Sequence, residues 1–142
     1  MKWNNNEMSL FLREDHLIIV RVNTKLKKFT LPAAEECVAK IIEMVKSDKH
    51  PKALFFYMPH VYIPKNVIRC YANTALGEAA VTVFCESLTA WLMGNISVEI
   101  KKRFMKSNPA SASPIKAFKN EANALAWSFE RMKEASLVTV DD

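Results

Sequence analysis

The chain has 142 residues, half of them apolar and a quarter charged, with only two glycines. Such a length is typical of one domain with one core, and the composition excludes disordered, collagen-like and glycine-rich linker proteins. Residues 1–7 lack the apolar region of a signal peptide, and no stretch approaches the roughly 20 apolar residues of a membrane helix. We therefore expect one cytoplasmic domain over residues 1–142, with its core at about 9–133 and no transmembrane segment.

The cysteines Cys37, Cys70 and Cys85 are far apart and set in apolar runs, which is typical of buried thiols in a reducing compartment rather than of disulfides. The net charge of +5 comes from several short basic groups. They lie at Lys25–Lys28, Lys46–Lys52 and Lys101–Lys106. Because they lack interleaved aromatic residues and a recognition motif, we interpret them as solvated faces and expect no nucleic-acid partner.

The first half of the chain predicts a hairpin, a helix and a buried strand. Ser9–Arg13 and His16–Val22 are apolar and β-branched around the turn-forming Glu14-Asp15. Thr30 is a plausible N-cap, with Pro32 in the first turn of the helix. The apolar stripe of this helix consists of Ala34, Val38, Ile41, Ile42 and Val45. Ala53–Met58 is a continuous apolar run, as expected for a central strand covered on both faces.

The second half predicts helices alternating with strands. A loop held by Pro59 and Pro64 leads to a short helix over Lys65–Tyr71, and Ala79–Phe84 is a further buried strand. A long amphipathic helix spans Glu86–Met105. Its expected apolar face is Leu88, Trp91, Leu92, Ile96, Ile100 and Phe104. After a polar loop over Ser107–Pro114, we expect a last strand at Ile115–Phe118.

Asn120 caps the expected final helix. Its apolar face is predicted to be Ala122, Leu125, Ala126, Phe129 and Met132, and residues 134–142 are expected to form a loose tail. The predicted order is therefore β-β-α-β-α-β-α-β-α. Strands separated by helices require right-handed crossovers, so we expect an α/β fold with a mixed, mostly parallel sheet of about five strands.

This order, with three local patterns, resembles the STAS-like (SpoIIAA-like) superfamily, and most closely its uncharacterised bacterial members. The patterns are Ala53–Ile63, Trp91–Asn95 and the strand-to-helix segment Ile115–Trp127, and the resemblance covers about Ser9–Lys133. It implies a scaffold that binds other proteins or, in some members, small ligands. STAS antagonists carry a phosphorylatable serine turn, whereas the corresponding Pro64-Lys65-Asn66-Val67 has no hydroxyl, acidic residue or glycine. We therefore expect no phosphorylation switch.

No catalytic apparatus is recognisable in the sequence. The histidines His16, His50 and His60 are scattered and have no partner at metal-ligand spacing, so we expect neither a metal nor another cofactor. Two glycines cannot build a glycine-rich phosphate loop. Cys85 lies where a strand becomes a helix, but no histidine is placed to activate it. The sequence therefore indicates a protein that is not an enzyme.

The sequence supports two functional hypotheses, binding of a protein partner and binding of a small ligand, and a weaker third one, attachment to a membrane surface. The first is a regulatory or adaptor protein that binds a protein partner through the loop and helix start near Pro59–Asn66, with a homodimer as a further option. The proposed contact residues are His60, Tyr62, Lys65, Asn66 and Arg69. The third, weaker idea is attachment of Lys101–Lys106 to a membrane surface.

The alternative to partner binding is a site for a small apolar or lipid-like ligand. Aromatic and methionine side chains are frequent around the two central strands and the long helix. They are Phe55, Phe56, Tyr57, Met58, Phe84, Trp91, Met93 and Phe104. A preformed apolar cavity with a few polar groups would favour this hypothesis, and a solidly packed interior would exclude it.

Overall fold

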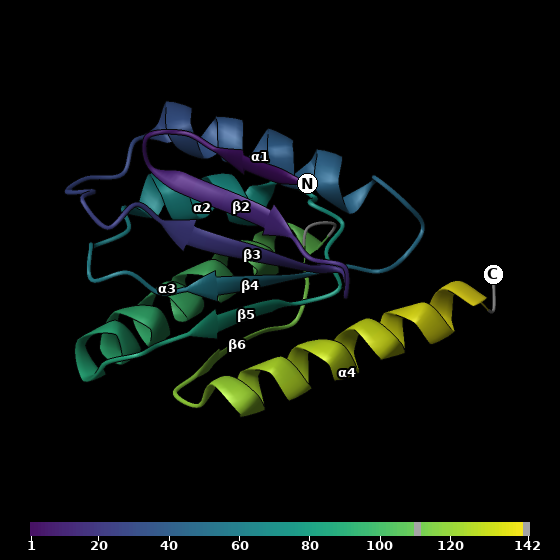
Figure 1. Ribbon diagram of the computed structural model, residues 1–142. Coiled ribbons are helices and arrows are strands. Elements are labelled where there is room, and N and C mark those ends of the chain that lie inside the picture. The colour runs from purple at the N-terminus through teal and green to yellow at the C-terminus, as the bar shows by residue number, and fades with distance from the viewer. Residues whose placement is uncertain (110–111, 141–142) are drawn as a thin grey trace.

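The computed structural model describes residues 1–109 and 112–140, with side chains described as far as residue 137. It is an α/β fold in which helices cover both faces of one six-stranded sheet (Figure 1). The strands are β1 (Lys2–Asn4), β2 (Met8–Leu12), β3 (Leu17–Val22), β4 (Ala53–Tyr57), β5 (Val81–Phe84) and β6 (Ile115–Phe118). The helices are α1 (Leu31–Val45), α2 (Lys65–Asn73), α3 (Leu88–Ser107) and α4 (Glu121–Val140). None of the described helices is long and apolar enough to cross a bilayer.

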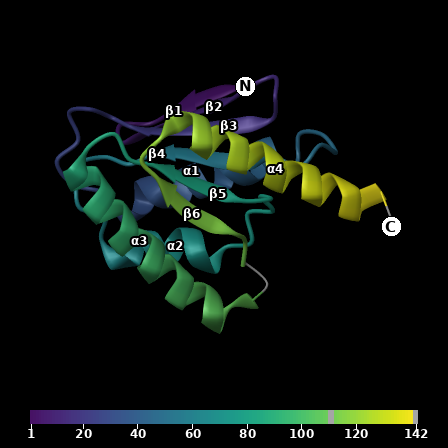
Figure 2. The same ribbon diagram turned by 90° about the horizontal axis from the view of Figure 1, so that it is seen from below.

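The strands lie in the sheet in the same order as in the sequence. β1, β2 and β3 are antiparallel, whereas β3, β4, β5 and β6 are parallel and joined through α1, α2 and α3. Parallel crossovers are right-handed almost without exception, and each one here advances to the next strand in the same direction. The three connecting helices therefore share one face, and α4, which follows the last strand, lies on the other (Figure 2).

The sheet has one strand more than expected. β1 pairs with β2 in the register Trp3 to Leu10, so it covers the edge of the expected hairpin. The sequence prediction missed it because Lys2–Asn4 is too short and polar to carry an alternating pattern, and its strand conformation depends on pairing with β2. Apart from β1, the order of elements follows the prediction, and β6 has the predicted bounds.

The core has two layers, one on each face of the sheet. Leu10, Val20 and Leu54 point toward α1, α2 and α3 and belong to the larger cluster. Phe55 and Phe84 point the other way, into a smaller cluster that α4 completes. The alternation follows from the strand period of two, and it confirms that β4 is covered on both faces.

Helix α3 packs on the core through only part of the face predicted for it. Trp91, Ile100 and Phe104 are partly buried against the core, as expected. The other expected core residues, Leu88, Leu92 and Ile96, are 71, 57 and 57 % exposed. The buried positions are Ala90, Gly94, Val98, Lys101 and Met105. The prediction followed the bulkiest apolar row, whereas the small residues allow the helix axis to approach the sheet closely. The outward row leaves an apolar stripe of Leu88, Leu92 and Ile96 on the surface.

Helix α4 shows a similar displacement. Met132 is buried as predicted, but the other buried positions are Ala124 and Ser128, and the predicted Phe129 is 38 % exposed. The Ser128 hydroxyl donates to the Ala124 carbonyl at 2.8 Å and lies 2.5 Å from the hydroxyl of Thr82, which therefore donates to it. A satisfied polar pair thus joins α4 to β5, which hydrophobic patterning could not predict.

Helix α4 continues to Val140, so most of the segment for which a loose tail was expected is helical. Its N-terminus agrees with the prediction, because Asn120 accepts a hydrogen bond from the backbone N–H of Asn123 at 2.9 Å. Residues 110–111 of the predicted loop and residues 141–142 of the predicted tail lie outside the described residues.

The contact of α3 with β5 generates a first prediction. A Cβ added at Gly94 would lie 2.8 Å from Cys85 Sγ and 3.5 Å from Val83 Cγ1. Gly94→Ala should therefore destabilise the protein, although alanine favours helix by about 1 kcal/mol. We expect a lower urea midpoint, and we expect the double variant Gly94→Ala/Cys85→Ala to recover part of the loss by removing the clashing sulfur. Equal stabilities for the wild type and Gly94→Ala would contradict this packing.

Candidate functional site

An apolar cavity of about 110 Å³ lies between the sheet and helices α1, α2 and α3. It extends from Met58 and Ile63, which follow the C-terminal end of β4, to Leu76 and Ile115, which lie near the N-terminal ends of β5 and β6. Its other lining residues are Met8, Val20, Phe29, Ile41, Leu54, Phe56, Val67, Ile68, Tyr71, Val81, Val83, Ser97, Val98 and Lys101. The polar members of this set, Tyr71, Ser97 and Lys101, come from α2 and α3.

Lys101 is the charged residue of the cavity wall. Its side chain is drawn inward with Val98 and Met105 on the buried face of α3, and the residue is only 7 % exposed. Its Nζ makes no hydrogen bond or ion pair with any residue in the described part of the chain, and it keeps contact with solvent rather than being buried without a partner. Burial lowers the pKa of the Lys101 ammonium, and the negative charge of Glu78 partly opposes that shift. Lys101 was expected on a solvated basic face, as its exposed neighbours Lys102 and Arg103 are.

The residues proposed for a small ligand divide between the two faces of the sheet. Phe56 and Met58 line the cavity. Phe55, Tyr57 and Phe84 instead contact one another on the α4 face, with ring centroids 5.4–6.2 Å apart. The sequence prediction identified β4 as a strand near the ligand site, but it did not separate the side chains that face the cavity from those that face α4. The burial of Lys101 was not predicted, because Lys101 belongs to a run of basic residues typical of a protein surface.

All five residues proposed for a protein partner, including Arg69, are exposed on the β4–α2 loop and α2. His60, Lys65 and Asn66 are exposed, and Tyr62 is 60 % exposed. The Arg69 guanidinium stacks over the ring of Phe104 on α3, 4.9 Å from its centroid. Arg69 therefore contributes to helix packing, and the loop residues next to the buried Ile63 remain accessible.

The thiols have no sign of nucleophilic activation. Cys37 and Cys85 are buried, and burial raises the pKa of each to about 11. Burial also raises the pKa of Cys70. A thiol must lose its proton to act as a nucleophile, so these shifts work against that role.

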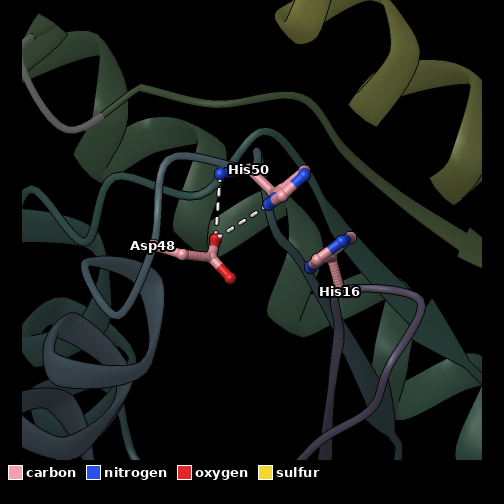
Figure 3. A group of neighbouring side chains, drawn as sticks. All are labelled: His16, Asp48 and His50. Carbon is pink, nitrogen blue, oxygen red and sulfur yellow. Dashed lines mark hydrogen bonds and ion pairs between the residues drawn. The ribbon is translucent and has the colours of Figure 1, made fainter.

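A second cluster, outside the cavity, joins His16, Asp48 and His50 (Figure 3). His16 comes from the β2–β3 turn, in a left-handed conformation with φ of 72°, and stacks on the His50 ring at a centroid distance of 4.2 Å. One ligand atom from each of the three residues lies within 4.8 Å of the other two. Two imidazoles and a carboxylate are ligands that Zn²⁺ and Fe²⁺ accept. The sequence missed the pair because His16 and His50 are distant along the chain.

The Asp48 carboxylate of this cluster already has partners. Its Oδ1 accepts from Lys52 Nζ at 2.6 Å and from the backbone N–H of His50 at 2.9 Å. Lys52 is completely buried and also donates to the carbonyls of Val45 and His50, so it ties the C-terminal end of α1 to the following loop. A cation here would have to compete with that ammonium, so the arrangement favours a structural role for Asp48. Lys52, too, was expected on a solvated face.

The Lys52 contact makes stability depend on pH. Together with the His50 backbone N–H, it lowers the pKa of Asp48 from 3.8 to about 2. A carboxyl whose pKa is depressed by folding contributes stability above its unfolded pKa, and that contribution is lost as pH falls from about 4 to about 2. We expect Asp48→Asn to lower the urea midpoint at pH 7 and to flatten its decline below pH 4. Glu99→Gln, which alters an exposed carboxylate 3.8 Å from Lys102, is the control and should change neither. An unchanged acid profile for Asp48→Asn would refute the assignment.

No protein-family model, no curated protein and no solved structure matches the chain significantly.

Proposed function

We propose that the protein binds a small apolar ligand in the cavity between the sheet and α1, α2 and α3, without catalysing a reaction. The observation that carries this proposal is the cavity itself, which is walled mainly by apolar side chains from sheet and helices. Protein interiors are close-packed, and a domain contains few voids larger than a water molecule. A void of this size lowers the stability of the free protein and offers a ligand a preformed site.

The volume limits the size of the ligand. An engineered cavity of about 150 Å³ in another protein admits benzene, so about 110 Å³ suits a ligand of benzene size or slightly smaller. A long acyl chain is too large for this space. The proposal therefore narrows the broader expectation of an apolar or lipid-like ligand to a compact one.

The position of the cavity also supports a regulatory role. Ile63 lines it and is 9 % exposed, whereas the adjacent Tyr62 is 60 % exposed. A ligand that displaces the side chain of Ile63 would also change the conformation of the β4–α2 loop. This proposal would unite ligand binding with recognition of a protein partner at His60, Tyr62 and the start of α2.

Filling the cavity tests the proposal. Val98 lines the cavity from α3, so Val98→Phe should remove much of the free space. We expect benzene to shift the amide resonances of cavity residues in the wild type, as seen in a ¹H–¹⁵N correlation spectrum, and to leave Val98→Phe unchanged. The matched control is Ile96→Phe, on the exposed side of the same helix, which should bind as the wild type does. If neither benzene nor xenon perturbs the wild type, the proposal fails.

A second candidate function is protein binding through α3. Leu88, Leu92 and Ile96 are spaced four residues apart, so they form one apolar stripe on the solvent side of the helix. Contiguous apolar surface of this kind is typical of an interface, and the STAS-like resemblance also favours a protein-binding scaffold. We take a second copy of the chain as the first partner to test. The sequence suggested a homodimer only as an option, and through the edge of the hairpin rather than through α3.

Sedimentation distinguishes this candidate. We expect the wild type to self-associate with rising concentration and Leu92→Glu to remain monomeric, because the charge would be buried in the contact. Leu137→Glu is the matched control, since Leu137 is also 60 % exposed but lies on α4. A wild type that stays monomeric at all concentrations would exclude self-association through α3.

A further inference from the structure

Strand β6 is an edge of the sheet, and no strand in the described part of the chain pairs with its outer side. The carbonyl of Phe118 faces β5, because it accepts from the backbone N–H of Cys85 at 2.9 Å. Successive residues of a strand direct their backbone groups to opposite sides, so the N–H and C=O groups of Ile115 and Ala117 point outward. Such a row of donors and acceptors can pair with a further strand.

An open groove of about 620 Å³ follows this edge. Its floor is the segment Lys116–Asn120. One wall is Trp91 in the first turn of α3, and the other is the face of α4 that carries Trp127 and Glu130. Trp91 packs on the core that α3 covers and Trp127 on the core that α4 covers, and Figure 2 shows β6 between these two helices. An extended chain in this groove would therefore have β6 beside it and an indole ring on each side.

The groove carries two exposed lysines. Each ammonium lies over an aromatic ring of the groove, Lys116 at 5.3 Å and Lys119 at 4.8 Å from the ring centroid. Neither lysine makes an ion pair within the described residues. The carboxylate of Glu130 does have a cationic partner, since it lies 3.3 Å from the Arg131 guanidinium. The charge of the groove is thus complementary to carboxylates.

The lysines also argue against two other occupants. Any antiparallel pairing of β6 with its own copy about a twofold axis puts Lys116 or Lys119 opposite or diagonal to itself, and like charges at such positions are destabilising. A nucleic-acid strand would satisfy the lysines, but it has no alternating donors and acceptors for the backbone of β6. A polypeptide with acidic side chains satisfies both.

We infer that the outer edge of β6 binds an extended acidic segment of a partner protein, which adds a seventh strand to the sheet. Lys116 shares one side of the groove with Trp127, and Lys119 shares the other with Trp91. Since alternate residues of a strand face opposite sides, the segment needs one acidic and one apolar side chain on each side. The site is independent of the apolar cavity.

A short peptide with this pattern tests strand addition. The probe is acetyl-Thr-Val-Asp-Glu-Val-Thr-amide, titrated into the full chain and followed by ¹H–¹⁵N correlation spectra. We expect shifts at Ile115, Ala117 and the indole N–H groups of Trp91 and Trp127. Two versions of the peptide carry N-methyl groups at alternate amides, and only the version methylated on the side that faces β6 should lose binding. Equal binding of the two versions, or no binding of the parent peptide, would overturn the inference.

Neutral variants test the role of the lysines. Lys116→Gln/Lys119→Gln should weaken binding of the acidic peptide by roughly two- to thirtyfold, the range expected for two exposed ion pairs. The analogue with Asn and Gln in place of the acids should bind the wild type and this variant equally. Lys102→Gln/Lys106→Gln, which removes two exposed lysines of α3, makes the same change in net charge and should behave as the wild type. An equal loss in both variants would refute a specific site.

A proline substitution separates the occupants. Ala117→Pro removes an outward N–H and leaves the hydrogen bonds to β5 intact, so it should abolish peptide binding in a folded protein. If the wild type sediments as a dimer that this substitution dissociates, the edge binds a second copy instead. If oligothymidylate binds at the groove and the peptide does not, the site binds nucleic acid. Either of the last two results overturns the inference, and the methylated peptides decide strand addition should Ala117→Pro fail to fold.

Discussion

The sequential order of the parallel strands constrains everything else in this molecule. Since each crossover advances in the same direction with the same hand, α1, α2 and α3 must share one face of the sheet. Three helices pack on that face, and the size of the residues that each helix directs toward the sheet sets how closely it approaches. α3 approaches closely at Gly94, where no Cβ separates it from Cys85. Farther along, the larger Val98 and Lys101 border the cavity.

The two lysines with buried side chains differ in their hydrogen-bond partners. Lys52 replaces water with three protein oxygens and so fixes the end of α1 against the loop that follows. Lys101 lines the cavity as a residue, but its Nζ has no partner among the described residues and keeps contact with solvent. A long lysine side chain can thus bury its apolar stem and leave its charged end in water.

Much of the fold could be predicted from local patterns. The apolar run at β4 and the polar interruption before β6 gave their elements directly, because a strand must alternate or be wholly apolar and a loop must satisfy its backbone in water. The stripe on α1 was also correct, with Ala34, Val38 and Ile41 buried. β1 was not predictable, since three residues acquire strand conformation only through a partner.

The sequence by itself determined the α/β class, the order of elements after β1 and the apolar character of the central strands, because these depend on periodicity and turn chemistry within short windows. Only the tertiary structure decided which row of α3 meets the sheet, since that depends on the space between helices and not on hydrophobicity alone. For the same reason it alone turned Lys101 from a presumed surface residue into the charged wall of a cavity. It also brought His16 to His50, whose separation along the chain concealed their contact.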